Sequence, residues 1–134
     1  MSGKQVDYSR LSIVIPAFNE AEAIGQVLAL VVSAMPGAEI LVVDDHSRDQ
    51  TCEVAKAVQG IKVIRHAFNQ GQGAALKTGM RRATRDYVAW FDADNEHRVQ
   101  DLDRIYARLL GDDLVAVIAQ RTSGSTSLVR AVGK

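Results

Sequence analysis

The sequence predicts an α/β fold in which a parallel sheet is covered by helices on both faces. Short apolar runs alternate with amphipathic stretches along the chain, which is the pattern of consecutive strand–helix–strand units. The apolar runs contain few polar residues, as is typical of strands that are buried on both faces. Right-handed crossovers, with a reversal after the first strand, then predict the strand order 3-2-1-4-5.

Three strands are predicted in the first half of the chain. They are expected at residues 11–15, 39–43 and 62–65. Pro16 ends the first of these runs, and the helix that follows has Asn19 available as its N-terminal cap. A second helix is expected after residues 47–49, which can cap it, and it contains Cys52. We interpret Cys52 as a packing residue because no partner for nucleophilic chemistry is evident near it.

The second half of the chain continues the alternation. An alanine-rich helix is predicted at 74–83, where Gly79 allows close packing against a neighbour. The remaining elements are expected to be a strand at 87–91, a helix through residues 102–109 and a strand at 114–119.

Composition indicates one soluble domain. The 134 residues are 47% hydrophobic and 24% charged, and the formal net charge of zero gives no strongly basic surface for nucleic acid. No apolar run approaches the length of a membrane span, and residues 1–10 lack the apolar core of a signal peptide. The single cysteine excludes an internal disulfide and fits a reducing compartment. We therefore expect a cytoplasmic protein.

Polar and acidic residues gather in the segments that follow the predicted strands. These segments are 16–20, 44–49, 66–73, 92–97 and 120–121. The carboxyl ends of parallel strands meet at one edge of a sheet, where ligands bind near the reversal of strand order. The sequence therefore predicts a ligand site at this edge and ordinary turns at the opposite one.

Asp92 and Asp94 are the strongest candidates for metal ligands. Residues two apart in extended backbone project to the same side, so both carboxylates would face the same way at the end of a strand. Two such charges repel unless a cation or a proton lies between them, and hard oxygen ligands favour Mg²⁺ or Mn²⁺ with substrate phosphates. Glu96 and His97 could add a ligand or a proton carrier. The alternative is a pair of solvated loop aspartates.

Asp45 and Glu20 are the candidates for direct ligand contact at the other strand ends. The Asp45 carboxylate can accept from a nucleobase imide or a ribose hydroxyl, whereas Asp44 is expected to have a structural role such as helix capping. Glu20 is better placed to contact a ligand than Asn19, for which capping is an equal explanation. Lys77 is either a phosphate ligand or a surface lysine.

Several other kinds of site are disfavoured. Gly71 and Gly73 precede a helix whose N-terminus could receive phosphate, but Leu76 stands where the dinucleotide fingerprint has its third glycine. There is no Walker A sequence. His46 and His66 are interpreted as solvated or locally hydrogen-bonded, and no Ser-His-Asp or Cys-His set for acyl chemistry can be assembled.

Four stretches in this order resemble the family 2 nucleotide-sugar glycosyltransferases, which have the Rossmann-like GT-A fold. The stretches are residues 12–20, 42–51, 69–79 and 92–97. The similarity is greatest to the branch of dolichol- and polyprenyl-phosphate sugar synthases. It implies a UDP- or GDP-sugar as donor, Mg²⁺ or Mn²⁺ as cofactor, and a polyprenyl phosphate at the membrane face as one candidate acceptor.

The resemblance also implies roles for individual residues. Asp92 and Asp94 would be the catalytic and metal-binding pair, joined by Glu96 in the metal shell. The nucleotide would be bound by Pro16, Ala17, Phe18, Glu20, Val43, Asp45, Lys77, Ala93 and Arg121, the last of these facing the diphosphate. The pattern departs from the family at three points, where His46 replaces a glycine, Glu96 replaces a glutamine, and Arg98-Val99 replaces a proline pair. We expect His46 to hinder a positive φ in the turn after Asp45.

Family catalytic domains are longer than this chain. We expect an N-terminal extension at 1–10, a donor-binding domain at 11–124, and at 125–134 a tail or the truncated start of an acceptor half that is otherwise absent. Residues 128–132 look like the start of a helix whose apolar side would favour self-association. The alternative function is a non-catalytic nucleotide-sugar binding module that acts with a partner subunit. A nucleotidyltransferase is less favoured because its glycine- and lysine-rich signature is missing.

Overall fold

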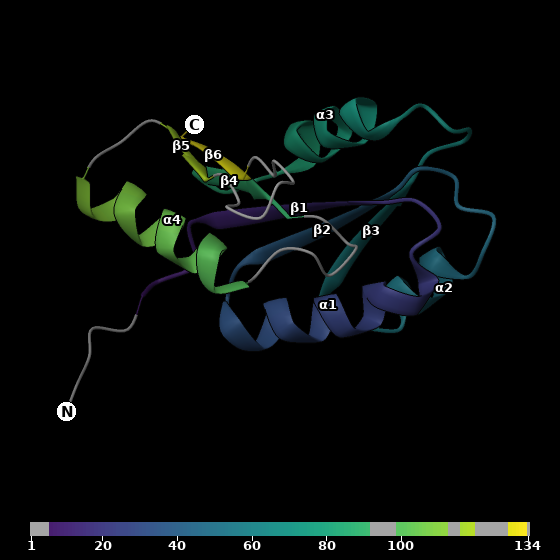
Figure 1. Ribbon diagram of the computed structural model, residues 1–134, viewed down its shortest axis with the longest axis horizontal. Coiled ribbons are helices and arrows are strands. Elements are labelled where there is room, and N and C mark those ends of the chain that lie inside the picture. The colour runs from purple at the N-terminus through teal and green to yellow at the C-terminus, as the bar shows by residue number, and fades with distance from the viewer. Residues whose placement is uncertain (1–5, 92–98, 113–115, 120–128, 134) are drawn as a thin grey trace.

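The computed structural model describes residues 6–91, 99–112, 116–119 and 129–133 (Figure 1). The elements are β1 (Leu11–Ala17), α1 (Ala21–Ala34), β2 (Glu39–Asp44), α2 (Thr51–Lys56), β3 (Ile61–Arg65), α3 (Gln72–Arg82), β4 (Tyr87–Trp90), α4 (Val99–Asp112), β5 (Ala116–Ala119) and β6 (Val129–Gly133). They form one sheet with the order β3-β2-β1-β4-β6-β5. The predicted α/β class is therefore confirmed.

The sheet is parallel across its first four strands and antiparallel beyond them. β1 pairs in parallel with both β2 and β4, and β2 pairs in parallel with β3, which confirms the predicted neighbours 3-2-1-4. β6 lies between β4 and β5 and is antiparallel to both, so the predicted contact between the fourth and fifth strands is wrong. The fourth and fifth strands are separated by β6, a strand that was not predicted from the sequence.

β6 occupies residues that were expected to begin a helix. A five-residue segment is too short for its pattern of apolar residues to distinguish strand from helix. In the structure Tyr87 lies opposite Gly133 and Val88 opposite Val132, so long-range pairing decides the conformation. The argument for self-association through a helix at this place therefore does not apply.

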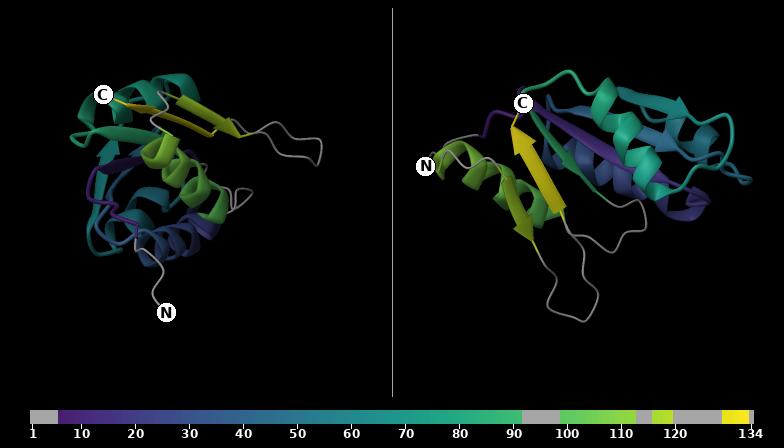
Figure 2. Two further views of the ribbon diagram at one scale, coloured as in Figure 1. Left: turned by 90° about the vertical axis from the view of Figure 1, so that its left-hand side faces the viewer. Right: turned by 90° about the horizontal axis from the view of Figure 1, so that it is seen from above.

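Helices cover both faces of the sheet, as predicted. α3 lies on one face, while α1, α2 and α4 lie on the other (Figures 1 and 2). Ile13 and Ile15 of β1 belong to the larger core beneath α1 and α4, whereas Val14 belongs to the smaller core beneath α3. This alternation is that of a strand with two buried faces. Cys52 is buried in α2, which confirms its interpretation as a packing residue.

β1 continues through Pro16, although the sequence predicted that the strand would stop there. Asp45 donates its main-chain N–H to the carbonyl oxygen of Ala17 at 2.9 Å, so Ala17 bonds on the β2 side. Val14 accepts from the N–H of Phe91 on the β4 side, and Pro16, two residues further, faces that same side. The described pairing with β4 ends at Val14. Pro16 has no main-chain N–H to donate, but it faces the β4 side, where the described pairing has already ended.

The segment before β1 packs against α4. Tyr8 donates to Asp103 at 2.5 Å, and Tyr106 donates to the carbonyl oxygen of Asp7 at 2.8 Å. The rings of Tyr8 and Tyr106 are stacked with centroids 5.8 Å apart. Burial and the neighbouring Asp103 raise the pKa of Tyr8 to about 12. Within the described residues, no helix has the length and apolar character needed to cross a bilayer.

Candidate functional site

The carboxyl ends of β1, β2 and β3 meet at one edge of the sheet and are locked together there by main-chain hydrogen bonds. Ala17 lies opposite Asp44, which in turn lies opposite Arg65. Beyond the ladder, His66 donates its N–H to the carbonyl oxygen of Asp44 at 2.9 Å. β1 lies between β2 and β4, so the chain adds strands first on one side of β1 and then on the other. The predicted edge therefore coincides with the reversal of strand order.

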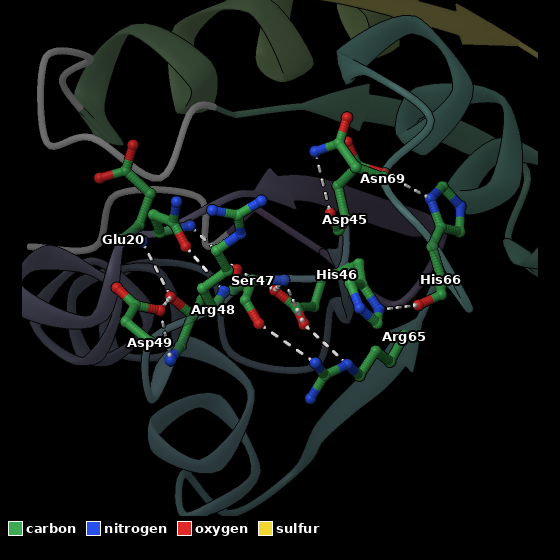
Figure 3. A network of polar contacts seen from close by, with 12 residues as sticks. Glu20, Asp45, His46, Ser47, Arg48, Asp49, Arg65, His66 and Asn69 are labelled. Carbon is green, nitrogen blue, oxygen red and sulfur yellow. Dashed lines mark hydrogen bonds and ion pairs between the residues drawn. The ribbon is translucent and has the colours of Figure 1, made fainter.

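Asp44 stabilises the turn that follows β2. Its buried carboxylate accepts from the N–H of Ser47 at 3.3 Å and from the Ser47 hydroxyl, and Arg65 Nε lies 3.6 Å from Oδ2 (Ser47 and Arg65 are labelled in Figure 3). Arg65 also donates to the carbonyl oxygen of Ser47 at 3.1 Å. Asp44 thus has the structural role that we expected, but it fixes a turn and does not cap a helix.

His46 adopts the positive φ that its side chain was expected to hinder. Its φ is 62°, in the left-handed region where histidine is more frequent than most non-glycine residues. Its Nδ1 lies 3.2 Å from the carbonyl oxygen of His66, and the adjacent Ser47 is held by Asp44 and Arg65. The surrounding contacts therefore impose the conformation that a glycine would adopt freely.

Asn19 connects the β1 loop to the same turn and does not cap α1. Its side-chain oxygen accepts from the N–H of Arg48 at 2.9 Å, and its own N–H donates to the Ser47 hydroxyl at 2.9 Å. The residue before α1 is Glu20, whose N–H donates to Thr51 Oγ1 at 2.8 Å. The backbone of the two loops is thereby fixed, and both Phe18 and Arg48 extend from it as exposed side chains.

Asp45 is held by donors from the loop that precedes α3. Its Oδ1 accepts from the N–H of Gln70 and lies 2.8 Å from His66 Nδ1, while its Oδ2 accepts from the N–H of Gly71 at 2.8 Å. Asn69 donates to its carbonyl oxygen at 3.3 Å. Burial raises the pKa of Asp45, but hydrogen bonds from Gln70, His66 and Gly71 outweigh that effect and hold it below the ordinary value.

The other predicted nucleotide-binding residues differ in exposure. Pro16 and Ala17 are buried in β1, and Val43 is buried in β2. Phe18 is 43% exposed, and Lys77 is exposed on α3. Pro16, Ala17 and Val43 therefore lie near the carboxyl ends of β1 and β2, whereas Phe18 and Lys77 present surface to solvent.

The predicted metal site lies outside the described residues, as do Asp92, Ala93, Asp94, Glu96, His97 and Arg121. Among the residues that the structure describes, no group of three or more His, Cys, Asp or Glu side chains is placed to hold a metal. β4, which directly precedes this stretch, is parallel to β1 and adjacent to it. Three carboxylates are oxygen donors of the kind that Mg²⁺ and Mn²⁺ prefer, so the donor set fits such an ion chemically.

The role of His66 was not predicted. We expected this residue to be solvated or locally bonded, but it is 7% exposed and its partners are 21 and 12 residues away in the sequence. His66 directly follows β3 and therefore lies at the same edge as Asp45, which is the signal that could have identified it.

A sheet whose parallel strands bring polar side chains together at the point of strand reversal defines a doubly wound α/β protein and gives it a candidate ligand site at that edge. The chain belongs to glycosyl transferase family 2, whose family model matches residues 12–132. Its fold is GT-A, as shown by similarity to solved structures. A mannosyltransferase from Pyrobaculum calidifontis in complex with GDP-Man and Mn²⁺ superposes with a TM-score of 0.75 at 21% identity, over 92% of this chain and 44% of that one.

A second solved structure and two curated relatives extend the comparison. Glucosyl-3-phosphoglycerate synthase from Mycobacterium tuberculosis, in complex with Mn²⁺, UDP-glucose and phosphoglyceric acid, superposes with a TM-score of 0.79 at 21% identity, over 99% of this chain and 62% of that one. Undecaprenyl-phosphate 4-deoxy-4-formamido-L-arabinose transferase from Pseudomonas fluorescens is 34% identical over 86% of this chain and 37% of its own. Dolichol-phosphate mannosyltransferase from Pyrococcus furiosus is 28% identical over 86% of this chain and 34% of its own.

The chain spans about a third to a half of the length of the curated relatives that it matches.

Proposed function

We propose that this chain binds a nucleoside-diphosphate sugar and contains the donor-binding half of a metal-dependent glycosyltransferase. The observation that carries the proposal is the position of Asp45, whose carboxylate is fixed by three donors at the point of strand reversal. A ligand site in an open parallel sheet is expected at that point. The proposal is supported by family membership and by the solved structures of the same fold, which are complexes with GDP-Man and with UDP-glucose.

We propose Asp92, Asp94 and Glu96 as ligands of Mg²⁺ or Mn²⁺. The support is the donor chemistry of three carboxylates that follow the strand adjacent to β1. A bound ion would stabilise the negative charge that develops on the leaving nucleoside diphosphate. In the same site, Asp45 would accept from the nucleoside, and Lys77 and Arg121 would contact phosphate oxygens.

Calorimetric titration with GDP and UDP, with and without Mn²⁺, tests the proposal. We expect binding of at least one of them to strengthen when Mn²⁺ is present. The Asp94→Ala variant should lose most of that Mn²⁺-dependent gain because a carboxylate is removed from the ion's shell. Asp86→Ala is the matched control, since Asp86 is an exposed partner of Arg10 before β4. Equal Mn²⁺-dependent affinity in Asp94→Ala and wild type would contradict the metal assignment.

A non-catalytic nucleotide-sugar binding module that acts with a partner subunit is the second candidate, and the observation that favours it is that the described contacts at this edge orient Asp45 as a binding group. Incubation of the chain with Mn²⁺ and a nucleotide sugar separates the two functions. A catalytic donor half releases nucleoside diphosphate slowly by hydrolysis, whereas a pure binder leaves the donor intact. For the acceptor we propose a polyprenyl phosphate at a membrane face, which rests on the names of the two curated relatives.

A further inference from the structure

His66 bridges Asp45 and α3 through a buried hydrogen bond on one side and a partly buried one on the other. Its Nδ1 lies 2.8 Å from Asp45 Oδ1, and its Nε2 lies 2.8 Å from the hydroxyl oxygen of Thr78 (Figure 3 shows the Asp45 contact). The His66 side chain is 6% exposed and the Asp45 side chain 5% exposed. Because Asp45 accepts hydrogen bonds as a carboxylate, Nδ1 carries a proton and donates to it.

The order of groups is that of a hydrolase triad, but the surroundings do not suit a nucleophile. Thr78 lies in the interior of α3, which runs from Gln72 to Arg82. Main-chain N–H groups at that depth are engaged in helical hydrogen bonds, so the described residues around Thr78 offer no free amides for an oxyanion. Thr78 is therefore an anchor for His66.

Three donors from the described part of the chain reach the Asp45 carboxylate. A carboxylate has about four lone-pair positions, and donors from the described residues fill three of them. The remaining position is fixed in direction because His66, Gln70 and Gly71 hold both oxygens. A ligand N–H or O–H that met this oxygen would find it already oriented, which lowers the cost of binding.

We propose that His66 is a positioning residue of the nucleoside site, which aims the Asp45 carboxylate at the ligand and is itself anchored by Thr78. The inference rests on the proposed nucleotide-binding function. It assigns roles to two further residues: His66, which contacts the Asp45 carboxylate, and Thr78, through which His66 is connected to α3. The expected consequence is that nucleotide affinity depends on the donor at the Nδ1 position of residue 66, and to a smaller degree on the hydroxyl of residue 78.

Two substitutions at position 66 separate positioning from packing. His66→Asn keeps an N–H donor close to the place of Nδ1, while His66→Leu fills similar space without a donor. We expect calorimetric affinity for GDP or UDP in the presence of Mn²⁺ to fall roughly tenfold or more in His66→Leu, since a hydrogen bond to a charged group is lost. His66→Asn should recover most of that affinity.

Thr78→Val supplies a milder test in case His66→Leu does not fold. It keeps the shape of the side chain and removes the hydroxyl, and we expect affinity to fall roughly threefold to tenfold. Equal affinities in wild type, His66→Leu and Thr78→Val would overturn the inference while leaving the proposed function standing. If His66→Leu is unfolded, unchanged affinity in Thr78→Val alone would overturn it. Absence of binding in the wild type would instead refute the proposed function, and the inference with it.

Discussion

Two buried carboxylates at opposite edges of the sheet differ in how far the chain itself satisfies them. Glu39, at the start of β2, accepts from Ser12 Oγ at 2.6 Å, Lys62 Nζ at 2.5 Å, and the N–H and hydroxyl of Thr84 at 2.8 Å each. Four donors fill the usual capacity of a carboxylate, whereas Asp45 receives three from the residues that the structure describes. The contacts of Glu39 give it a structural role, and for Asp45 we propose a role in contacting the ligand.

Protonation of Glu39 should lower the free energy of unfolding as the pH falls. Burial raises its pKa, but hydrogen bonds from Lys62, Ser12 and Thr84 outweigh that effect and place the pKa at about 2, below the ordinary 4.5. A depressed folded-state pKa stabilises the protein above pH 4.5, and that contribution is lost as the pH falls from 4.5 towards 2. We expect a loss on the order of 3 kcal/mol across this window.

Urea unfolding at pH values from 6 to about 2.5 measures this effect. The Glu39→Gln variant should be less stable than wild type at pH 6 and should show a flatter dependence on pH below 4.5. Asp86→Asn is the control, because Asp86 and Arg10 form an exposed ion pair that is expected to contribute little. The same acid dependence in Glu39→Gln and wild type would show that another group is responsible.

Individual side-chain roles were the least predictable part of the site. Asp44 and Asp45 could be recognised as a pair at a strand end, but their division of roles depends on Ser47, Arg65 and the loop before α3. The positive φ of His46 depends equally on neighbours that are distant in sequence. Such contacts are decided by tertiary packing, which the local pattern of residues does not contain.

The packing of α3 on the sheet requires a glycine at position 79, as the sequence analysis anticipated. A Cβ at Gly79 would lie 2.2 Å from Val14 Cγ1, and Val14 is fully buried in the middle of β1. We expect Gly79→Ala to lower the free energy of unfolding by about 1–3 kcal/mol, because the helix must move away from the sheet. Urea unfolding provides the measurement.

Gly73 is a matched control on the same helix. A Cβ at Gly73 would have no atom within 4 Å, so Gly73→Ala should be neutral or stabilising by up to about 1 kcal/mol. In the double variant Gly79→Ala with Val14→Ala, the clashes with the two Val14 methyl groups disappear and only the milder contact with Cβ of residue 14 at 3.1 Å remains, so the combined loss should be smaller than the sum of the single losses. Strict additivity would mean that the helix does not contact β1 in this way.

Elements with strong local patterns were predicted well, and those fixed by long-range pairing were not. β1 to β4 and the helices between them follow from apolar runs, periodicity and the glycine and proline residues that bound them. β6 could not be predicted because Val129–Gly133 gains its conformation by pairing with β4, some forty residues earlier in the chain. The continuation of β1 through Pro16 has the same origin, since it depends on where β4 ends.

At the scale of the whole molecule, we expect donor binding without efficient transfer. The sheet edge brings the Asp45 turn, the loop before α3 and the end of β4 to one place, which is where we propose that the nucleotide binds. An acceptor must also be held in line with the sugar, and such positioning is worth roughly 7–11 kcal/mol of a bimolecular barrier. The contacts that the structure describes at this edge orient Asp45 for the donor, and we assign none of them to an acceptor.

We therefore expect residues 1–134 to bind GDP or UDP with Mn²⁺ and to transfer sugar to a polyprenyl phosphate at a rate close to background. The measurement combines calorimetry with transfer of radiolabelled sugar from the nucleotide sugar, both on one preparation, so that failed transfer cannot be attributed to unfolded protein. Mixing the chain with an excess of candidate acceptors in detergent provides the most permissive condition. Rapid transfer under that condition would show that these 134 residues already contain the acceptor site, and that the positioning argument underestimates what this edge of the sheet can do.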